Sequence, residues 1–135
     1  MKNLNLISLP WADYELLDSG DNRKLERYGA YILIRPETQA IWKPKHPEAW
    51  KKAHAEFCWV DGKGGWRAKD VPEYWQMSWH DVRFTARLTS FKHTGVFPEQ
   101  EKNWQWIQER VAQLHTPAVL NLFGYTGIAS IAAAR

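Results

Sequence analysis

Short stretches of alternating hydrophobic and polar residues run through the first 90 positions of the chain. Residues 82–89, Val-Arg-Phe-Thr-Ala-Arg-Leu-Thr, carry apolar side chains at every second position, which is the pattern of a strand with one buried face. The turn-forming run Ser-Gly-Asp-Asn at 19–22 predicts a hairpin of 14–18 with 23–27. Further strands are predicted at 31–34, 41–42, 57–60 and 66–68, and a short helix over 47–55. This part of the chain is therefore predicted to be mostly β.

A longer helix is predicted to begin at Pro98. Proline suits the first helical position, and Glu99 and Glu101 lie in the first turn, where the positive end of the helix dipole favours carboxylates. The expected buried stripe recurs at steps of three and four residues, at Trp104, Ile107, Val111 and Leu114. Trp106 lies off this stripe and is expected to cover the junction with the β-rich part.

The stretch from 118 to 130, Ala-Val-Leu-Asn-Leu-Phe-Gly-Tyr-Thr-Gly-Ile-Ala-Ser, has a different pattern. Its first six residues are mostly apolar without alternation, which predicts a strand buried on both faces of a parallel sheet. Gly124 and Gly127 bound a tight turn, and an apolar helix is predicted from Ile128. A strand, a tight loop and a helix N-terminus collect unpaired backbone N–H groups, and open α/β sheets bind nucleotides at such places.

This loop does not match a dinucleotide fingerprint. That fingerprint requires a third glycine three residues after the second, and Ser130 stands at this position. A nicotinamide-binding turn also usually opens its domain, whereas this loop lies late in the chain. A nicotinamide oxidoreductase is kept as a third alternative because Gly-x-Thr-Gly also occurs in that class.

Two segments together resemble a known family. Residues 120–127, Leu-Asn-Leu-Phe-Gly-Tyr-Thr-Gly, resemble motif I of class I S-adenosylmethionine-dependent methyltransferases. Residues 91–100, Phe-Lys-His-Thr-Gly-Val-Phe-Pro-Glu-Gln, look like the Thr-Gly-x-Phe-x-Asp-Gln segment that precedes motif I in the branch containing bacterial ribosomal-RNA methyltransferases. The clear resemblance covers residues 82–135, and a weaker one, to the N-terminal domain of a subgroup, covers 18–44. It implies methyl transfer from S-adenosylmethionine, with RNA, and ribosomal RNA in particular, as the favoured substrate.

The resemblance also implies which residues contact the cofactor. Asn121 and the carbonyl of Phe123 are expected near its amino group, although Asn121 replaces the acidic residue common at this place. The loop residues Gly124, Tyr125, Thr126 and Gly127 are expected to approach the cofactor closely. From the upstream segment, the residues expected to face the same pocket are Thr94, Phe97 and Gln100. Glu99 stands where the family usually has aspartate.

The expected fold class is α+β. A β-rich N-terminal domain is predicted at residues 1–90, followed at 91–135 by the first βα unit of a truncated Rossmann-like (α/β) methyltransferase domain. Methyltransferases of this class continue through a second strand with an acidic residue and a later catalytic motif, and neither is present here. The chain is therefore interpreted as an N-terminal fragment that is inactive alone, with its catalytic residues downstream.

The amino-acid composition indicates the class of protein and its cellular compartment. A hydrophobic fraction of 44% with 24% charged residues is typical of a soluble globular protein, and the sequence contains no run of membrane-spanning length. The single cysteine, Cys58, fits a reducing cytoplasm and excludes an intramolecular disulfide. The five histidines show no ligand spacing, so no structural metal site is expected.

Several features of the sequence are compatible with binding to RNA. The net charge is +3 and the pI is near 9.0. Alternation puts Arg83 and Arg87 on one side of their strand, and Lys92 and His93 follow in the next loop; these residues are either phosphate contacts or an ordinary solvated surface. The nine tryptophans are interpreted first as core residues and second as base-stacking platforms. A non-catalytic RNA-binding module is accordingly the main alternative to a methyltransferase.

Overall fold

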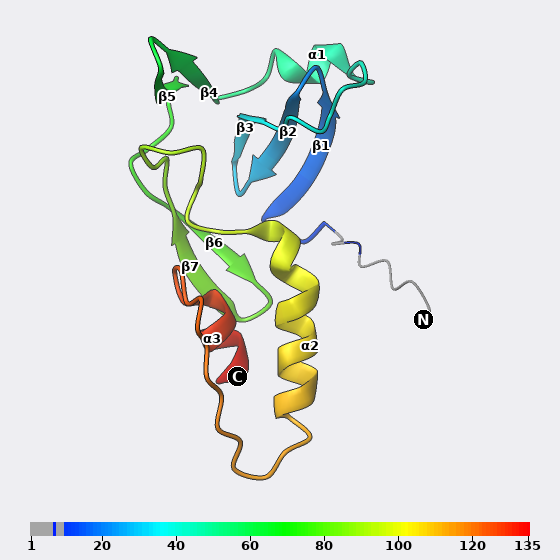
Figure 1. The fold of residues 1–135 in the computed structure, drawn as a ribbon, viewed down its shortest axis with the longest axis vertical. Coiled ribbons are helices and arrows are strands. Elements are labelled where there is room, and N and C mark those ends of the chain that lie inside the picture. The colour runs from blue at the N-terminus through cyan, green and yellow to red at the C-terminus, as the bar shows by residue number, and fades with distance from the viewer. Residues whose placement is uncertain (1–6, 8–9) are drawn as a thin grey trace.

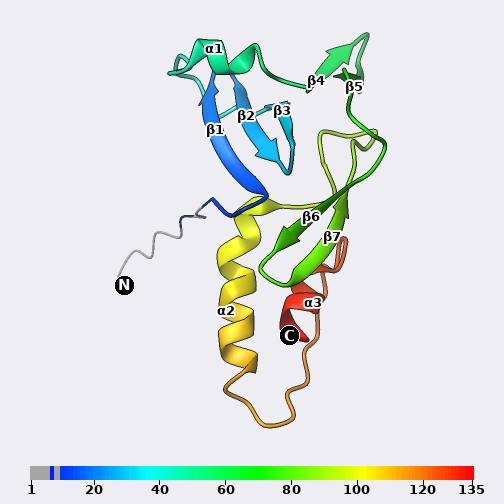
Figure 2. The ribbon, with the colours of Figure 1, turned by 180° about the vertical axis from the view of Figure 1, so that it is seen from behind.

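The computed structural model describes residue 7 and residues 10–135 (Figure 1). The elements follow in the order β1 (Tyr14–Gly20), β2 (Arg23–Tyr28), β3 (Tyr31–Pro36), α1 (Pro47–Trp50), β4 (Ala55–Val60), β5 (Lys63–Ala68), β6 (Trp75–Trp79), β7 (Val82–Ala86), the short 3-10 helix η1 (Pro98–Gln100), α2 (Glu101–Val111) and α3 (Ile128–Ala133). Both views place the β1–β5 strands toward one end of the molecule and the β6–β7 hairpin with α2 and α3 toward the other (Figures 1 and 2).

The first five strands form one sheet in the order β1-β2-β3-β4-β5. Neighbouring strands are antiparallel except for β3 and β4, which are parallel and share a short contact from Leu33 and Ile34 to Ala55 and Glu56. The predicted β1–β2 hairpin is confirmed. Its two turn residues, Asp21 and Asn22, have positive φ angles, which short polar residues tolerate better than most. The predicted β4–β5 hairpin also forms.

The connection from β3 to β4 differs from the prediction. Residues 41–42 form no strand; the carbonyl of Trp42 instead accepts a hydrogen bond from the turn amide of Asp21 at 2.8 Å. α1 ends at Trp50 rather than continuing to 55, because Ala55 is the first residue of β4 and must be extended to pair with β3 and β5.

The carboxylate of Asp18 holds this connection against β1. Asp18 is 8% exposed, and its carboxylate oxygens accept hydrogen bonds from the backbone N–H groups of Ser19 (2.8 Å), Lys45 (3.2 Å) and His46 (2.9 Å) and from the indole of Trp50 (2.9 Å). Burial by itself raises the pKa of Asp18, but these four donors outweigh it and lower the pKa to about 2.

The substitution Asp18→Asn is expected to lower the free energy of unfolding by about 1–3 kcal/mol, since the NH₂ that replaces one carboxylate oxygen cannot accept from the two N–H donors bound to that oxygen. Because the folded-state pKa is the lower one, the carboxylate stabilises the fold above about pH 4, and this contribution is lost as the pH falls toward 2. Urea unfolding followed by tryptophan fluorescence should show the gap between wild type and variant narrowing from pH 4 to pH 2. A gap that is constant over this range would contradict the assignment.

The β6–β7 hairpin forms a second, two-stranded sheet. β7 is the predicted strand with one buried face: Val82 and Ala86 are buried, and Arg83 is exposed. β6 was not predicted, although Trp75, Met77 and Trp79 alternate with less buried residues. β7 ends at Ala86, before the predicted end at residue 89, and the amide of Arg87 then donates to the carbonyl of Thr94 in the following loop.

One hydrophobic core joins the two sheets and the helices. Trp79 and Trp104 pack edge to face with ring centroids 5.4 Å apart, and Trp11 contacts Trp104 from the other side at 6.0 Å. Ile128 and Ala132 of α3 belong to the same buried cluster, which draws on residues from both sides of position 90. The proposed division into domains at 90/91 stays a prediction. The helical stripe is confirmed for Trp104, whereas Leu114 is exposed beyond the end of α2.

The predicted strand at residues 118–123 is wrong for this structure. No strand is assigned there among the described residues, and Leu120, Leu122 and Phe123 are all exposed, Phe123 to 91%. A strand buried on both faces needs hydrogen-bonded neighbours and side chains packed above and below it, and no described strand pairs with this segment. The helix predicted to follow does form, as α3.

Candidate functional site

An open cavity of about 970 Å³ lies between α2 and the loop that leads into α3. On one side its lining consists of Phe97, Glu99, Gln100, Asn103, Trp104, Trp106 and Ile107, and on the other of Asn121, Leu122, Phe123, Gly124, Tyr125, Thr126, Ile128 and Ala129. The lining includes residues of both segments that were paired by resemblance, 91–100 and 120–127. The fold brings them together because α3 packs beside α2.

Most residues predicted to contact a cofactor line this cavity, namely Phe97, Gln100, Asn121, Phe123, Gly124, Tyr125 and Thr126. Thr94 and Gly127 do not line it. Thr94 is fully buried, and its carbonyl accepts a hydrogen bond from the amide of Arg87 at 3.1 Å. Gly127 lies just behind the loop as the N-cap residue of α3. Their contact with a cofactor stays a prediction.

The loop at 124–127 is a tight turn joined to the upstream segment. The amide of Gly127 donates to the carbonyl of Gly124 at 2.7 Å, and Gly127 has a φ of +89°, a conformation that glycine adopts without steric cost. The hydroxyl of Thr126 donates to the carbonyl of Gly95 at 2.6 Å. Tyr125 packs on Phe97 with ring centroids 4.5 Å apart. The two motif segments are therefore in direct contact.

Asn121 and Ser130 hold the two ends of this loop together. The side-chain amide of Asn121 donates to the hydroxyl of Ser130 at 2.9 Å, and its carbonyl oxygen accepts from the amide of Phe123 at 3.2 Å. Ser130 stands where a dinucleotide-binding loop has its third glycine, and here its hydroxyl closes the loop. Sequence reasoning did not anticipate this role.

Sequence reasoning also missed the contribution of α2 to the cavity. Asn103 and Ile107 line it from positions three and seven residues after Gln100, which is the spacing of one helical face. Asn103 donates to the side-chain oxygen of Gln100 at 2.8 Å. Trp106, expected to cover the junction with the β-rich part, is instead largely exposed and lines the cavity. The helical spacing from Gln100 could have indicated Asn103 and Ile107.

The residues considered for RNA contact lie outside the cavity lining. Arg83 and Arg87 are exposed, and the guanidinium of Arg87 lies 5.9 Å from the ring centroid of Tyr74. Lys92 is exposed as well. His93 packs edge to face on Phe97 at 5.2 Å; its partial burial, together with the charges of Arg35 and Lys92, lowers its pKa, which favours a neutral imidazole.

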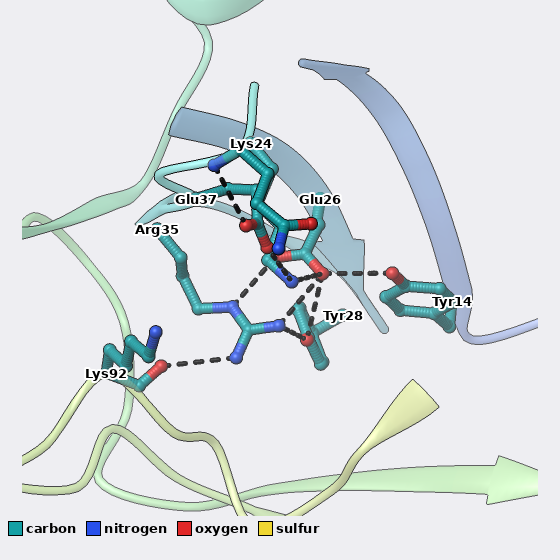
Figure 3. A network of polar contacts seen from close by, with 8 residues as sticks. Tyr14, Lys24, Glu26, Tyr28, Arg35, Glu37 and Lys92 are labelled. Atoms are coloured by element: carbon teal, nitrogen blue, oxygen red, sulfur yellow. Dashed lines mark hydrogen bonds and ion pairs between the residues drawn. The ribbon is translucent and has the colours of Figure 1, made fainter. Parts of the chain in front are cut away.

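A buried ionic network ties the first sheet to the segment that leads into the cavity (Figure 3). Arg35 donates to both carboxylate oxygens of Glu26, at 2.7 and 2.9 Å, and to the backbone carbonyl of Lys92 at 3.2 Å. The hydroxyl of Tyr14 donates to Glu26 at 2.9 Å, and Tyr28 contacts both charged groups. Burial alone raises the pKa of Glu26, but the hydrogen bonds and charge of Arg35 outweigh it, so the pKa lies below its ordinary value. Nothing in the sequence pattern indicated this network.

In the described part of the chain, no group of three or more His, Cys, Asp or Glu side chains is placed to hold a metal ion. No helix among residues 10–135 combines the length and apolar character needed to cross a membrane.

Comparison with known proteins supports the resemblance. The chain matches the crystal structure of a SAM-dependent methyltransferase from Agrobacterium tumefaciens with 47% sequence identity and a TM-score of 0.84, over 90% of this chain and 40% of that one. A putative SAM-dependent methyltransferase from Streptococcus mutans matches at 18% identity and a TM-score of 0.65, over 91% of this chain and 36% of that one. The crystal structure of SMU.776, a putative methyltransferase complexed with SAH, matches with 18% sequence identity and a TM-score of 0.61. This match covers 91% of this chain and 35% of that one.

No protein-family model and no curated protein matches the chain. The two structures at 18% identity show a shared fold, whereas the first match also shares almost half of its aligned residues. Together they confirm the predicted resemblance to SAM-dependent methyltransferases and the mixed, strand-rich fold class. The chain spans about two fifths of the length of the first of these structures. The narrower resemblance to the ribosomal-RNA branch stays a prediction.

Proposed function

We propose that this chain forms the N-terminal part of an S-adenosylmethionine-dependent methyltransferase and that the cavity between α2 and the 121–129 loop is part of its cofactor site. The observation that carries this proposal is the contact between the two motif segments around one cavity, through Thr126 with Gly95 and Tyr125 with Phe97. The 47% sequence identity to a SAM-dependent methyltransferase supports this proposal.

The residues of the cavity fit such a cofactor chemically. S-adenosylmethionine combines an amino-acid end, a ribose and a flat adenine ring, and it supplies a methyl group on a sulfonium. The cavity offers amide groups from Asn121, Gln100 and Asn103 together with aromatic surface from Phe97 and Tyr125. Asn121 is neutral and already accepts from the Phe123 amide, so it would hold a cationic amine less strongly than a carboxylate would. The chain's own task is to hold and orient the cofactor.

The proposed substrate is RNA, with ribosomal RNA favoured, and the proposed location is the cytoplasm. Exposed Arg83, Arg87 and Lys92 supply positive charge near the segment that leads to the cavity, and His93 contacts the lining residue Phe97. Positive side chains of this kind contact phosphates without reading sequence. The single thiol of Cys58 is free, as a reducing compartment would leave it.

The catalytic residues are proposed to lie in the part of the enzyme that this chain does not span. The matched methyltransferase is about two and a half times as long as the region shared with this chain. The 135-residue chain alone is therefore expected to transfer no methyl group and to bind the cofactor weakly or not at all.

The full-length protein is expected to bind S-adenosylmethionine and not NAD. The paired motif segments favour the former, and Ser130, which hydrogen-bonds Asn121, occupies the place of the third glycine that a dinucleotide loop needs. Isothermal titration calorimetry with both ligands measures this difference. Saturable NAD binding without S-adenosylmethionine binding would contradict the proposal. Binding of neither, with binding of RNA, would favour the non-catalytic RNA-binding module.

A further inference from the structure

The β4–β5 hairpin carries a row of aromatic rings that ends in solvent. Trp59 is 66% exposed; its ring lies 5.6 Å from that of Phe57, which lies 5.5 Å from that of Trp66, centroid to centroid. The register pairs Trp59 with Gly64 and Phe57 with Trp66, so these rings share one face of the hairpin. Gly64 leaves room for them: a Cβ there would lie 2.5 Å from Phe57 Cζ.

Trp66 joins this hairpin to the loop that follows β7. Its indole N–H donates to the backbone carbonyls of Thr89 (2.9 Å) and Phe91 (3.0 Å). Phe91 itself is 69% exposed. Both ribbon views show the hairpin beside this loop (Figures 1 and 2). Trp66 therefore connects two segments that each carry an exposed aromatic ring, Trp59 on the hairpin and Phe91 in the loop.

The net positive charge of the chain lies in residues 43–69, which run from the connection before α1 to the end of the β4–β5 hairpin. Residues 43–69 contain seven lysines and arginines against three carboxylates, whereas the rest of the chain has eleven against twelve. The whole net positive charge therefore comes from residues 43–69. Lys92 is exposed next to Phe91. Lys63 and Arg67 are exposed on the edge strand β5, where strand alternation places them on the face opposite to Trp66 and Trp59.

We infer that Trp59 and Phe91 form a stacking platform for unpaired bases of single-stranded RNA, with Lys92, beside Phe91, contacting a phosphate and the other cations of residues 43–69 adding longer-range attraction. Aromatic rings stack on bases and cations follow the backbone in single-strand binding proteins. The identification of the partner as the RNA substrate rests on the proposed function. We define the stacking platform as Trp59 and Phe91.

The platform continues toward the proposed cofactor cavity. Two residues after Phe91, His93 packs on Phe97 at 5.2 Å, and Phe97 packs on Tyr125 at 4.5 Å inside the cavity lining. A strand held on the platform would therefore lie near the entrance to the site. Base-paired RNA hides its bases from such rings, and recognition by stacking selects loops, bulges and ends.

The test is fluorescence anisotropy with a fluorescein-labelled mixed-sequence 12-nucleotide RNA and the 135-residue chain, in the absence of S-adenosylmethionine. Loss of one stacking ring costs roughly 5- to 100-fold in affinity, so Trp59→Ala and Phe91→Ala should each weaken RNA binding by that factor. Trp59→Phe, which keeps a ring, should retain most of the affinity. Trp42→Ala is the matched control, because Trp42 is an exposed tryptophan in the loop before α1, and it should bind like wild type.

The outcomes separate this inference from the proposed function. The platform would be overturned if Trp59→Ala and Phe91→Ala both bind RNA with wild-type affinity. It would also be overturned if Trp42→Ala loses as much RNA affinity as they do. Equally tight binding of the DNA oligonucleotide of the same sequence, or of a blunt RNA duplex, would overturn the assignment to single-stranded RNA. Far-ultraviolet circular dichroism confirms that each variant is folded. Failure of the full-length protein to bind S-adenosylmethionine would remove the proposed function and leave the RNA result standing.

Discussion

Replacement of Arg35 by alanine is expected to lower the free energy of unfolding by about 3–5 kcal/mol, because it removes the guanidinium that donates to both oxygens of the fully buried carboxylate of Glu26. Glu26 has no exposed surface, and Arg35 supplies two hydrogen bonds to it and a third to the Lys92 carbonyl. Lys24 remains within 3.5 Å of Glu26 but lies on one side of it. Urea unfolding at pH 7, followed by tryptophan fluorescence, measures the loss.

The matched control is the exposed pair Lys51–Glu48, whose side chains are both largely in solvent. Lys51→Ala should change stability by less than about 0.5 kcal/mol, since exposed pairs contribute little. An Arg35→Ala loss as small as that of Lys51→Ala would contradict a structural role for the network.

The same network predicts a pH dependence. The pKa of Glu26 is lower in the folded protein than its ordinary value, so the pair stabilises the fold above the unfolded glutamate pKa of about 4.3. This contribution is lost as the pH falls through the lower, folded-state pKa. The stability difference between wild type and Arg35→Ala should therefore shrink in acid.

Gly127→Val is expected to abolish S-adenosylmethionine binding by the full-length protein. Gly127 has a φ of +89°, and no protein atom lies within 4 Å of a Cβ built there. The strain therefore comes from the backbone and not from a clash. A β-branched residue held at such an angle costs roughly 1–3 kcal/mol, which the loop relieves by moving, and this movement displaces Tyr125 and Thr126 from the cavity lining. Calorimetry measures the affinity.

Gly62→Val supplies the control for this substitution. Gly62 also has a positive φ, of +75°, and open space around a Cβ, but it lies in the β4–β5 turn. The two variants therefore impose a similar backbone strain at different places. Gly62→Val should leave S-adenosylmethionine affinity unchanged, and a folded Gly127→Val protein with wild-type affinity would refute the loop's role.

Local patterns predicted the elements that depend on local chemistry. The turn at 19–22, the alternation in β7 and the proline and stripe of α2 each depend on neighbouring residues, and these elements form. The strand expected at 118–123 does not form, because a strand buried on both faces depends on neighbours that its own sequence does not contain. The β6 alternation was present at Trp75, Met77 and Trp79 but was overlooked among many tryptophans.

Part of the candidate site could also be predicted from the sequence. Motif resemblance indicated Phe97 and residues 121–126, which line one cavity. The face of α2 that completes it, including Asn103 and Ile107, lies outside both motif segments, and only its helical spacing from Gln100 pointed to it. The Glu26–Arg35 pair was also beyond sequence reasoning, because charged residues in alternating strands are expected to face solvent.

The central claim is that the cavity between α2 and the 121–129 loop binds S-adenosylmethionine. Ultraviolet photolabelling of the full-length protein with radiolabelled S-adenosylmethionine, followed by peptide mapping, tests it most directly. The account predicts that label is incorporated within residues 97–107 and 119–130, where Phe97, Tyr125 and the other lining residues lie, and that excess SAH competes it away. Competed label confined to the β1–β5 sheet, with none in these two segments, would contradict the claim.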